Sequence, residues 1–290
     1  MKVLVSADTS SLLTKDVLVK NGISVFPLNV IIDGQEYLDG VSIEQDFLYD
    51  SMKANKVIKT STPPLGQVVE YFEELFKKGY DKVIHFTISS KLSSMYNLFK
   101  TVSEEYFDNK VIVIDAYSVS SLMLSHVLYA LDEVKNETPV EEIVKTIEER
   151  KNDAYIIFVP ENLTSLKNGG RISPAIAALG NVLGLKPVIA LKEGELVKDT
   201  MTRNIKKTFI DRVNEIKDNY PISKYDYSLI NFKGNETIVE SIKNHINSLF
   251  NEEVVIEGLI PINVCAHCGP GTIGLLITPK INNISLSKYL

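Results

Sequence analysis

The alternation of strand-like and helix-like segments constrains this 290-residue chain more than any other feature. Short apolar runs at 82–88, 111–114 and 155–159 have the length and composition of buried strands. Helix-like segments lie between them, one running to about residue 106 and one at 119–133. Such alternation predicts an α/β fold with a largely parallel sheet and helices on its faces.

The length of the chain allows two ordinary domains. We place an N-terminal α/β domain at 1–155 and a C-terminal α/β domain at 156–290; the boundary is approximate because no linker rich in Pro, Gly or Ser separates them. Thr138 is the expected N-cap of the helix that runs to Arg150. Further strands are expected at 2–6, 29–32, 36–38, 186–191, 196–197, 225–230 and 254–260, further helices at 14–20, 45–53, 65–78, 203–217 and 236–250, and hairpin turns at Asp33-Gly34 and Glu193-Gly194.

Charge and hydropathy exclude two classes of protein. A net charge of -6 and a pI near 5.4 argue against nucleic acid as a partner, which needs a concentrated basic surface. The longest apolar stretch, 174–191, is interrupted by Asn181, Lys186 and Pro187, so it makes a poor membrane span and a better pocket wall. The apolar run before Asp8 is too short for a signal peptide, and we expect a cytoplasmic protein.

The segment Gly169-Gly170-Arg171 suggests an anion site beside apolar sequence. Two consecutive glycines allow backbone conformations that other residues avoid, and the run from Pro174 to Leu185 is apolar and helix-compatible. The arginine offers a planar fork of donors for a carboxylate or a phosphate. A glycine-rich turn with a solvated arginine is the alternative interpretation of the same residues.

Two hydroxyl-rich segments offer more donors. Thr60-Ser61-Thr62 stands before two prolines, and four serines follow the predicted strand at 82–88. Helix capping would use one hydroxyl in each segment and leave the others for a ligand. The four serines are Ser89, Ser90, Ser93 and Ser94.

His267 stands between the two cysteines of the chain, Cys265 and Cys268. The glycine-rich segment that follows predicts that His267 is presented at the end of a strand, where ligands often meet α/β folds. The C-x-x-C spacing lacks the further Cys or His ligands of a zinc site and does not precede a helix as a thioredoxin-like pair does. We therefore expect reduced thiols with no redox or metal role.

Four motifs, in this order, resemble those of the DegV family, the fatty-acid-binding proteins of bacterial fatty acid kinases. The resemblance spans nearly the whole chain and includes the family's G-x-x-x-x-x-K-P run at 180–187. The motifs are Thr60-Ser61-Thr62-Pro63 for T-S-x-P, Ser89-Ser90-Lys91-Leu92-Ser93-Ser94-Met95-Tyr96 for S-S-G-L-S-G-T-Y, Gly169-Gly170-Arg171-Ile172-Ser173 for G-G-R-I-S, and Ala266-His267-Cys268-Gly269-Pro270-Gly271 for A-H-x-G-x-G.

The resemblance implies two α/β domains with an acyl-chain pocket between them. Thr60 and Ser93 would bind the carboxylate of a long-chain fatty acid. Arg171 and His267 would lie at the head-group end, where an acyl phosphate forms, and Arg203 would face the catalytic subunit of the kinase. Further candidates for the head-group site are Ser61, Thr62, Ser94 and Gly170.

The resemblance also implies a substrate-binding subunit, without catalytic activity alone, that serves phospholipid metabolism and is compatible with transient contact at a membrane surface. No G-x-x-x-x-G-K-[ST] or G-x-G-x-x-G motif is present, so ATP and Mg²⁺ are expected on the partner kinase and no cofactor is expected in this chain.

The chain departs from the family pattern in two places. The first loop reads V-S-A-D-T-S at 5–10 in place of V-T-D-S-T, and Lys91, Ser94 and Met95 replace Gly, Gly and Thr.

Two other functions remain open from the residues. A free-standing serine hydrolase would use Ser93 and His267, and it would need the histidine within reach of the serine, an acid behind the histidine and an oxyanion hole. The G-x-S-x-G motif of one such class is missing. A lipid-sensing regulator would bind the same ligand without a kinase partner.

Overall fold

The computed structural model describes residues 1–11, 20–177, 184–258 and 260–289, which form three sheets. The first sheet comes from the N-terminal half of the chain and is parallel throughout, as the alternation predicts. Its strands, in spatial order, are β2 (Ser24–Phe26), β1 (Val3–Asp8), β6 (Lys82–Thr87) and β7 (Val111–Asp115).

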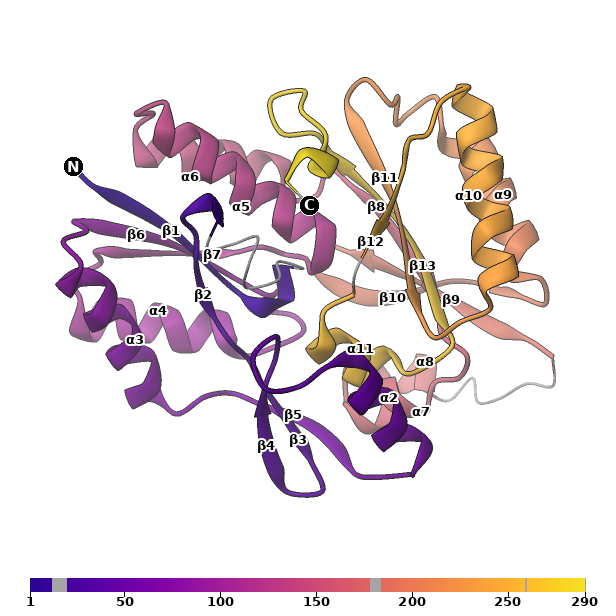
Figure 1. Ribbon diagram of the computed structural model, residues 1–290, viewed down its shortest axis with the longest axis horizontal. Helices are drawn as coiled ribbons and strands as arrows, with labels where there is room; N and C mark the ends of the chain where they lie inside the picture. Colours follow the sequence, from indigo (N-terminus) through magenta and orange to yellow (C-terminus); the bar gives the residue numbers. More distant parts are fainter. Residues whose placement is uncertain (12–19, 178–183, 259, 290) are drawn as a thin grey trace.

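Helices cover both faces of the first sheet (Figure 1). Successive residues of a strand point to opposite faces. Leu4 and Val83 therefore pack toward α3 (Leu65–Lys77) and α4 (Met95–Tyr106), while Val5 and Ile84 pack toward α5 (Ser120–Lys135) and α6 (Val140–Arg150). The strands at 82–87 and 111–115 are thus buried on both sides, which explains their continuous apolar sequence.

The second sheet has six strands, and its pairing is mostly antiparallel. The prediction of a largely parallel sheet is wrong for this part of the chain. The short turn at Glu193-Gly194 joins two neighbouring strands directly, and the last strand of the chain runs between two others in the opposite direction. The strand order is β10 (Glu195–Thr202), β9 (Lys186–Lys192), β8 (Tyr155–Val159), β13 (Thr272–Pro279), β11 (Tyr225–Phe232) and β12 (Val255–Gly258), with α9 (Ile205–Ile216) and α10 (Glu236–Phe250) on the outer face.

The third sheet is small, with the order β4 (Gln35–Leu38), β3 (Asn29–Ile32) and β5 (Ile58–Ser61). Its predicted hairpin at Asp33-Gly34 is confirmed, with both residues at positive φ. One buried cluster joins this sheet and α2 (Gln45–Lys53) to α11 (Ile262–Cys268) and to β13, and it contains Val30, Leu48 and Cys265. The two halves of the chain therefore share buried contacts here, and the division into domains at 155 stays a prediction.

Three predicted segments differ from the structure or extend outside its described residues. Thr138 does not cap α6; its hydroxyl donates to Glu133 at 2.6 Å, and the helix begins after Pro139. The helix predicted at 14–20 falls almost entirely on residues 12–19, outside the described residues. Of the apolar run after Arg171, Pro174–Ala177 forms the short helix α8, and residues 178–183 also lie outside the described ranges.

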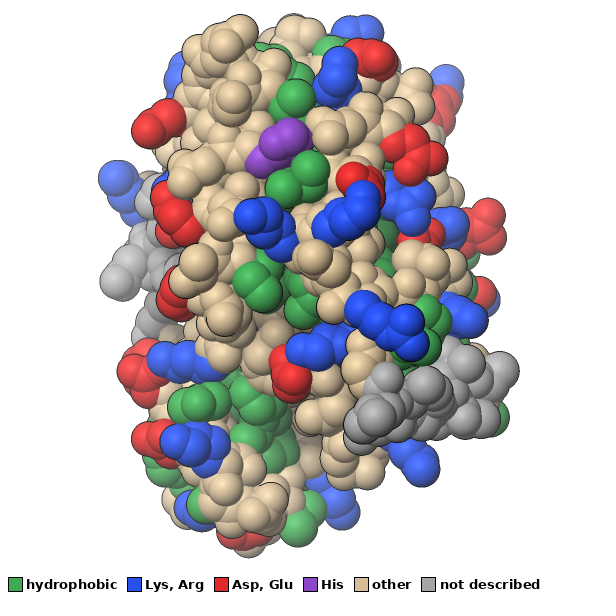
Figure 2. All heavy atoms as spheres, turned by 90° about the vertical axis from the view of Figure 1, so that its right-hand side faces the viewer, with side chains coloured by type: hydrophobic (Ala, Val, Ile, Leu, Met, Phe, Trp, Pro, Cys, Tyr) green, Lys and Arg blue, Asp and Glu red, His purple; other side chains and the backbone are tan. Residues whose placement is uncertain are grey.

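Figure 2 shows the face that carries α9 and α10, where Lys and Arg side chains are interspersed with Asp and Glu. The pairs Lys207 with Asp211 and Arg212 with Glu215 lie on this face, at helical spacing within α9. In the described parts of the chain, no helix has both the length and the apolar character that crossing a membrane requires.

Candidate functional site

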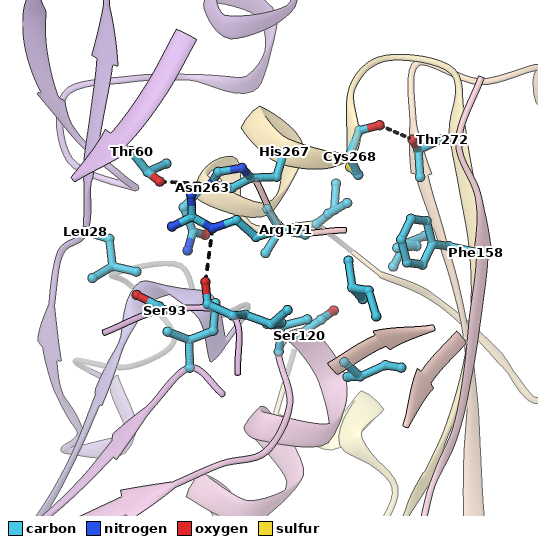
Figure 3. A pocket seen from close by; sticks show the side chains of 18 of the residues that line it. Leu28, Thr60, Ser93, Ser120, Phe158, Arg171, Asn263, His267, Cys268 and Thr272 are labelled. Carbon is cyan, nitrogen blue, oxygen red and sulfur yellow. Dashed lines mark hydrogen bonds between the residues drawn. The ribbon is translucent and has the colours of Figure 1, made fainter. Parts of the chain in front are cut away.

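Residues from the second and third sheets, from the loops that follow β6 and β7 and from α11 line one pocket (Figure 3). It encloses about 1120 Å³, including the part open to solvent. Thr60, Arg171 and His267 lie together in Figure 3, apart from Phe158. Most of the other lining residues are apolar: Leu28, Ile88, Leu92, Met95, Val119, Ile156, Ile157, Phe158, Leu191, Leu196, Ile230, Ile260, Val264 and Leu276.

The glycine pair sets the position of Arg171. The helix α7 (Thr164–Asn168) ends at Gly169, and Gly170 turns the chain at a φ of +68°, a value that only glycine takes without strain. A Cβ atom on Gly169 would lie 2.2 Å from Nδ1 of His267. The first glycine therefore makes room for the histidine, and the second redirects the backbone toward the pocket.

The Arg171 guanidinium is held in place by backbone carbonyls. Its Nε atom donates to the carbonyl of Leu92 at 3.1 Å (Figure 3), and its Nη1 atom donates to the carbonyl of Gly169. Partial burial lowers its pKa, although the group stays charged at neutral pH. None of the ion pairs formed by the described residues includes Arg171. A half-buried cation of this kind favours an anionic ligand.

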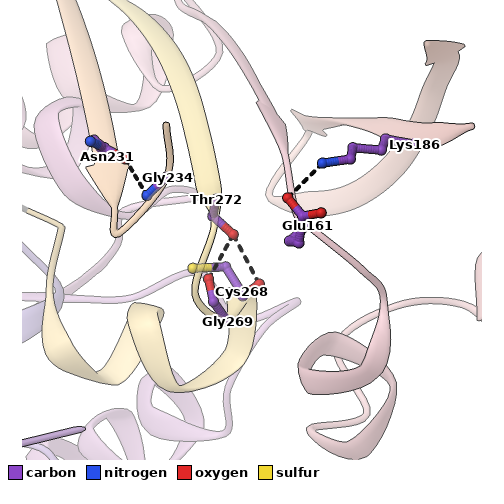
Figure 4. Close-up of polar contacts among 7 residues, drawn as sticks. All are labelled: Glu161, Lys186, Asn231, Gly234, Cys268, Gly269 and Thr272. Carbon is purple, nitrogen blue, oxygen red and sulfur yellow. Dashed lines mark hydrogen bonds and ion pairs between the residues drawn. The ribbon is translucent and has the colours of Figure 1, made fainter. Parts of the chain in front are cut away.

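His267 lies on α11, so the prediction that it stands at a strand end is wrong. Pro261 precedes the first turn of this helix, and Gly269, at a φ of +76°, ends it. The hydroxyl of Thr272 donates to the carbonyls of Cys268 and Gly269 and holds the end of the helix against β13 (Figure 4).

The imidazole of His267 is neutral at physiological pH. Burial, and then the nearby charge of Arg171, lower its pKa to about 4. A hydrogen bond of 2.9 Å joins its Nε2 atom to the hydroxyl of Thr60. Its Nδ1 atom is buried and has no hydrogen-bond partner among the described residues. Of the three neighbouring side chains Thr60, Arg171 and His267, Arg171 is therefore the one that carries a charge.

The predicted hydroxyl set divides into pocket residues and structural residues. Thr60, Ser61, Thr62 and Ser93 line the pocket, and neither α3 nor α4 has a side-chain cap at its N-cap residue. The interpretation of Thr60-Ser61-Thr62 as a cap of α3 is therefore wrong, since Pro64 stands at that position.

Three serines of the loop after β6, including the pocket residue Ser93, form hydrogen bonds within the protein. Ser89 donates from a buried hydroxyl to the carbonyl of Gly194 at 2.6 Å, which ties the first sheet to the β9–β10 hairpin. Ser94 forms a 2.7 Å hydrogen bond with Thr62 on the exposed side. Ser93 accepts a long hydrogen bond of 3.4 Å from the amide of Met95.

Two predicted residues lie away from the pocket wall. Gly170 adjoins Arg171 but does not line the pocket. Arg203 is exposed between β10 and α9, beside Asn204, whose side chain caps α9. The roles assigned to Thr60, Ser93, Arg171, His267 and Arg203 stay predictions.

Asn263 is a pocket residue that sequence reasoning missed. It lies one helical turn before His267 on α11, a spacing that could have identified it. Its Nδ2 atom donates to the hydroxyl of Ser10 at 2.7 Å, and its Oδ1 atom is buried without a partner among the described residues. The backbone amide of Asn263 donates to the carboxylate of Asp39 at 3.1 Å, and burial raises the pKa of that carboxyl to about 7.

Cys265 and Cys268 are free and buried. Burial raises the pKa of both thiols, that of Cys268 to about 12. Reactive cysteines have lowered pKa values, so this environment favours inert thiols, of which Cys268 adjoins the pocket.

The geometry does not fit a serine hydrolase. Nε2 of His267 is bonded to Thr60 and not to Ser93, and Nδ1 has no acid behind it in the part of the chain that the structure describes. A triad requires both contacts.

Comparison with known proteins identifies close likenesses over almost the full length. The profile of the family described as "uncharacterised protein, DegV family" matches residues 2–280. A DegV domain-containing protein of Staphylococcus aureus is 30% identical over 283 residues, which are 96% of this chain and 99% of that protein.

Solved structures of DegV family and fatty-acid-binding proteins are also similar to this chain over almost its full length. One describes fatty acid binding of a DegV family protein from Thermus thermophilus; it is 26% identical, with a TM-score of 0.85, and the match covers 96% of this chain and 100% of that one. Another is a stearic acid-binding protein from Eubacterium ventriosum, 25% identical with a TM-score of 0.83, for which the match covers 98% of this chain and 100% of that one.

Proposed function

The chain belongs to the DegV family, and we propose that it binds a long-chain fatty acid in the pocket and presents its carboxylate to a separate ATP-dependent kinase subunit. The observation that carries the proposal is the meeting of an apolar chamber with one half-buried arginine that lacks an acidic partner among the described residues. The structures of fatty-acid-binding relatives support the binding part of this proposal.

The two parts of the pocket account for the two parts of such a ligand. Burying about fifteen methylene groups at roughly 0.8 kcal/mol each contributes on the order of 12 kcal/mol before the costs of association. Hydrogen bonds to the charged carboxylate contribute roughly 1.5 to 3 kcal/mol each. The apolar wall thus supplies affinity, whereas Thr60, Ser93 and Arg171 fix the orientation of the chain.

Acyl phosphate formation needs little covalent chemistry from this subunit. A carboxylate oxygen attacks the terminal phosphorus of ATP on the partner, and the bond to ADP breaks with its electron pair. The role of this chain is to position the carboxylate and to balance the developing charge. Arg171 supplies the positive charge, and the neutral His267 supplies a hydrogen bond without adding charge.

The first test is mass spectrometry of the natively purified protein, with and without denaturation. A fatty acid at near-stoichiometric amount supports the binding function and gives the chain length. An empty protein that also takes up no added fatty acid refutes it. A second experiment tests presentation to a kinase: the loaded protein should capture an ATP-dependent kinase, and the bound acid should then be consumed only when ATP is added. A protein that binds lipid without such a partner would instead be a lipid sensor.

A further inference from the structure

A second hollow meets the fatty-acid pocket at its polar end. We call it the outer groove; it encloses about 1270 Å³, including the part open to solvent. Thr60, Arg171 and His267 line both hollows, so the two hollows meet at these three residues. The rest of the outer groove comes mainly from the segment between α2 and β5, from α7 and from the end of α11, whereas β8 and the loops after β6 and β7 line only the acyl chamber.

The chemistry of the outer groove is opposite to that of the acyl chamber. Besides Arg171, two lysines line it, Lys56 and Lys59, and the remaining wall includes amide and hydroxyl side chains such as Asn168 and Thr164. No Asp or Glu is among its described lining residues. In a chain of net charge -6, this is a local concentration of positive charge.

The two lysines are available to a ligand. Both side chains are exposed, and neither takes part in an ion pair formed by the described residues. Lys56 lies over the ring of Phe47, with Nζ 5.7 Å from its centroid, which holds the stem without neutralising the charge. Lys59 lies on β5, one residue before Thr60, so the same strand carries a lysine of the outer groove and a residue that lines both hollows.

We propose that the outer groove binds a phosphoryl group next to Thr60, Arg171 and His267, where the two hollows meet. The inference rests on the proposed function. Phosphoryl transfer changes the head group from one negative charge on the carboxylate to two on the phosphoryl oxygens, while ATP loses one charge in becoming ADP. The added charge lies beyond the carboxylate oxygen, and Lys56 and Lys59 supply cations there that a fatty acid alone does not need.

The test compares two ligands of equal chain length, a fatty acid and an alkyl phosphate, at pH 8, where the alkyl phosphate carries close to two charges. The variant is the double substitution Lys56→Ala with Lys59→Ala. We expect alkyl phosphate affinity to fall by about tenfold or more, as for the loss of hydrogen bonds to a charged group, and fatty acid affinity to stay within about twofold. The matched control, Lys53→Ala with Lys100→Ala, removes the same charge from outside the groove and should leave both affinities within that range.

A second arm identifies the source of the phosphoryl group. Inorganic phosphate that competes with the alkyl phosphate, and does so only when Lys56 and Lys59 are present, shows that the outer groove takes free phosphate as well. Equal losses for both ligands, or equal losses in the control variant, overturn the proposal. If the wild-type protein binds the fatty acid but the alkyl phosphate shows no lysine dependence, the groove proposal fails alone; if neither ligand binds, the proposed function fails with it.

Discussion

Gly169→Ala is the sharpest test of how the head-group site is built. The backbone of Gly169 has a φ of -74°, which alanine adopts without strain. The added Cβ would lie 2.2 Å from Nδ1 and 2.9 Å from Cε1 of His267, closer than non-bonded atoms approach. The imidazole must therefore move, and its 2.9 Å hydrogen bond to Thr60 is lost.

The expected effect is on ligand affinity. Displacing one group that orients the carboxylate removes roughly 1.5 to 3 kcal/mol, or about 10- to 150-fold in dissociation constant. Displacement of a fluorescent fatty acid by unlabelled ligand measures this loss. Gly170→Ala is the matched control: it has open space around it but a φ of +68°, so it should lower the free energy of unfolding by about 1 to 2 kcal/mol with little change in affinity.

A double-mutant cycle separates the clash from other effects of the methyl group. In a His267→Ala background the ring is absent, so Gly169→Ala should cause no further loss of affinity. The reasoning is refuted if Gly169→Ala weakens binding equally in both backgrounds, or if it leaves wild-type affinity unchanged.

Three other substitutions have distinct expected outcomes. Arg171→Lys keeps the charge but loses the fork that reaches Leu92, so the same displacement assay should show affinity lower by roughly tenfold, and unchanged affinity would contradict a role for that geometry. Ser89→Ala leaves the carbonyl of Gly194 unpaired, and urea denaturation should show a loss of about 1 to 3 kcal/mol in the free energy of unfolding; a smaller change would mean that water replaces the hydroxyl. Burial raises the pKa of Asp39 from 3.8 to about 7, so between these pH values the folded state keeps a proton that the unfolded state releases. This group's contribution to stability is therefore full below pH 4 and is lost as pH rises to 7; Asp39→Asn should flatten that part of the profile of unfolding free energy against pH, and an unaltered slope would argue against the shift.

Much of the fold follows from local patterns. The helices at 45–53 and 236–250 have the predicted bounds because their apolar residues repeat at helical spacing and face a core. The parallel first sheet follows from helices that separate its later strands. The order of the second sheet could not be predicted, since the position of β13 between β8 and β11 depends on distant pairings, and those with β8 join residues more than a hundred positions apart.

The site, too, could be predicted only where local sequence determines it. Motif chemistry pointed to Thr60, Arg171 and His267, which the structure brings together around one pocket end. The helix that carries His267 was missed because its first turn is supported from elsewhere: the carboxyl of Asp39 accepts a hydrogen bond from the amide of Asn263, 224 residues away in sequence. No local signal in a seven-residue helix records such a partner.

The contacts of Arg171 distinguish the two interpretations of Gly169-Gly170-Arg171, an anion site or a turn with a solvated arginine. A solvated arginine on a turn would be free to move, whereas this guanidinium donates to the carbonyls of Leu92 and Gly169 and is about half buried. Because Leu92 adjoins Ser93, the hydrogen bond from Arg171 also fixes this residue of the predicted head-group end relative to Ser93, which is predicted to bind the carboxylate. A ligand then finds its donors already oriented and loses less conformational entropy in binding. The glycines serve this arrangement by leaving room for the histidine and by turning the chain, so the motif is a packing device as well as a source of charge.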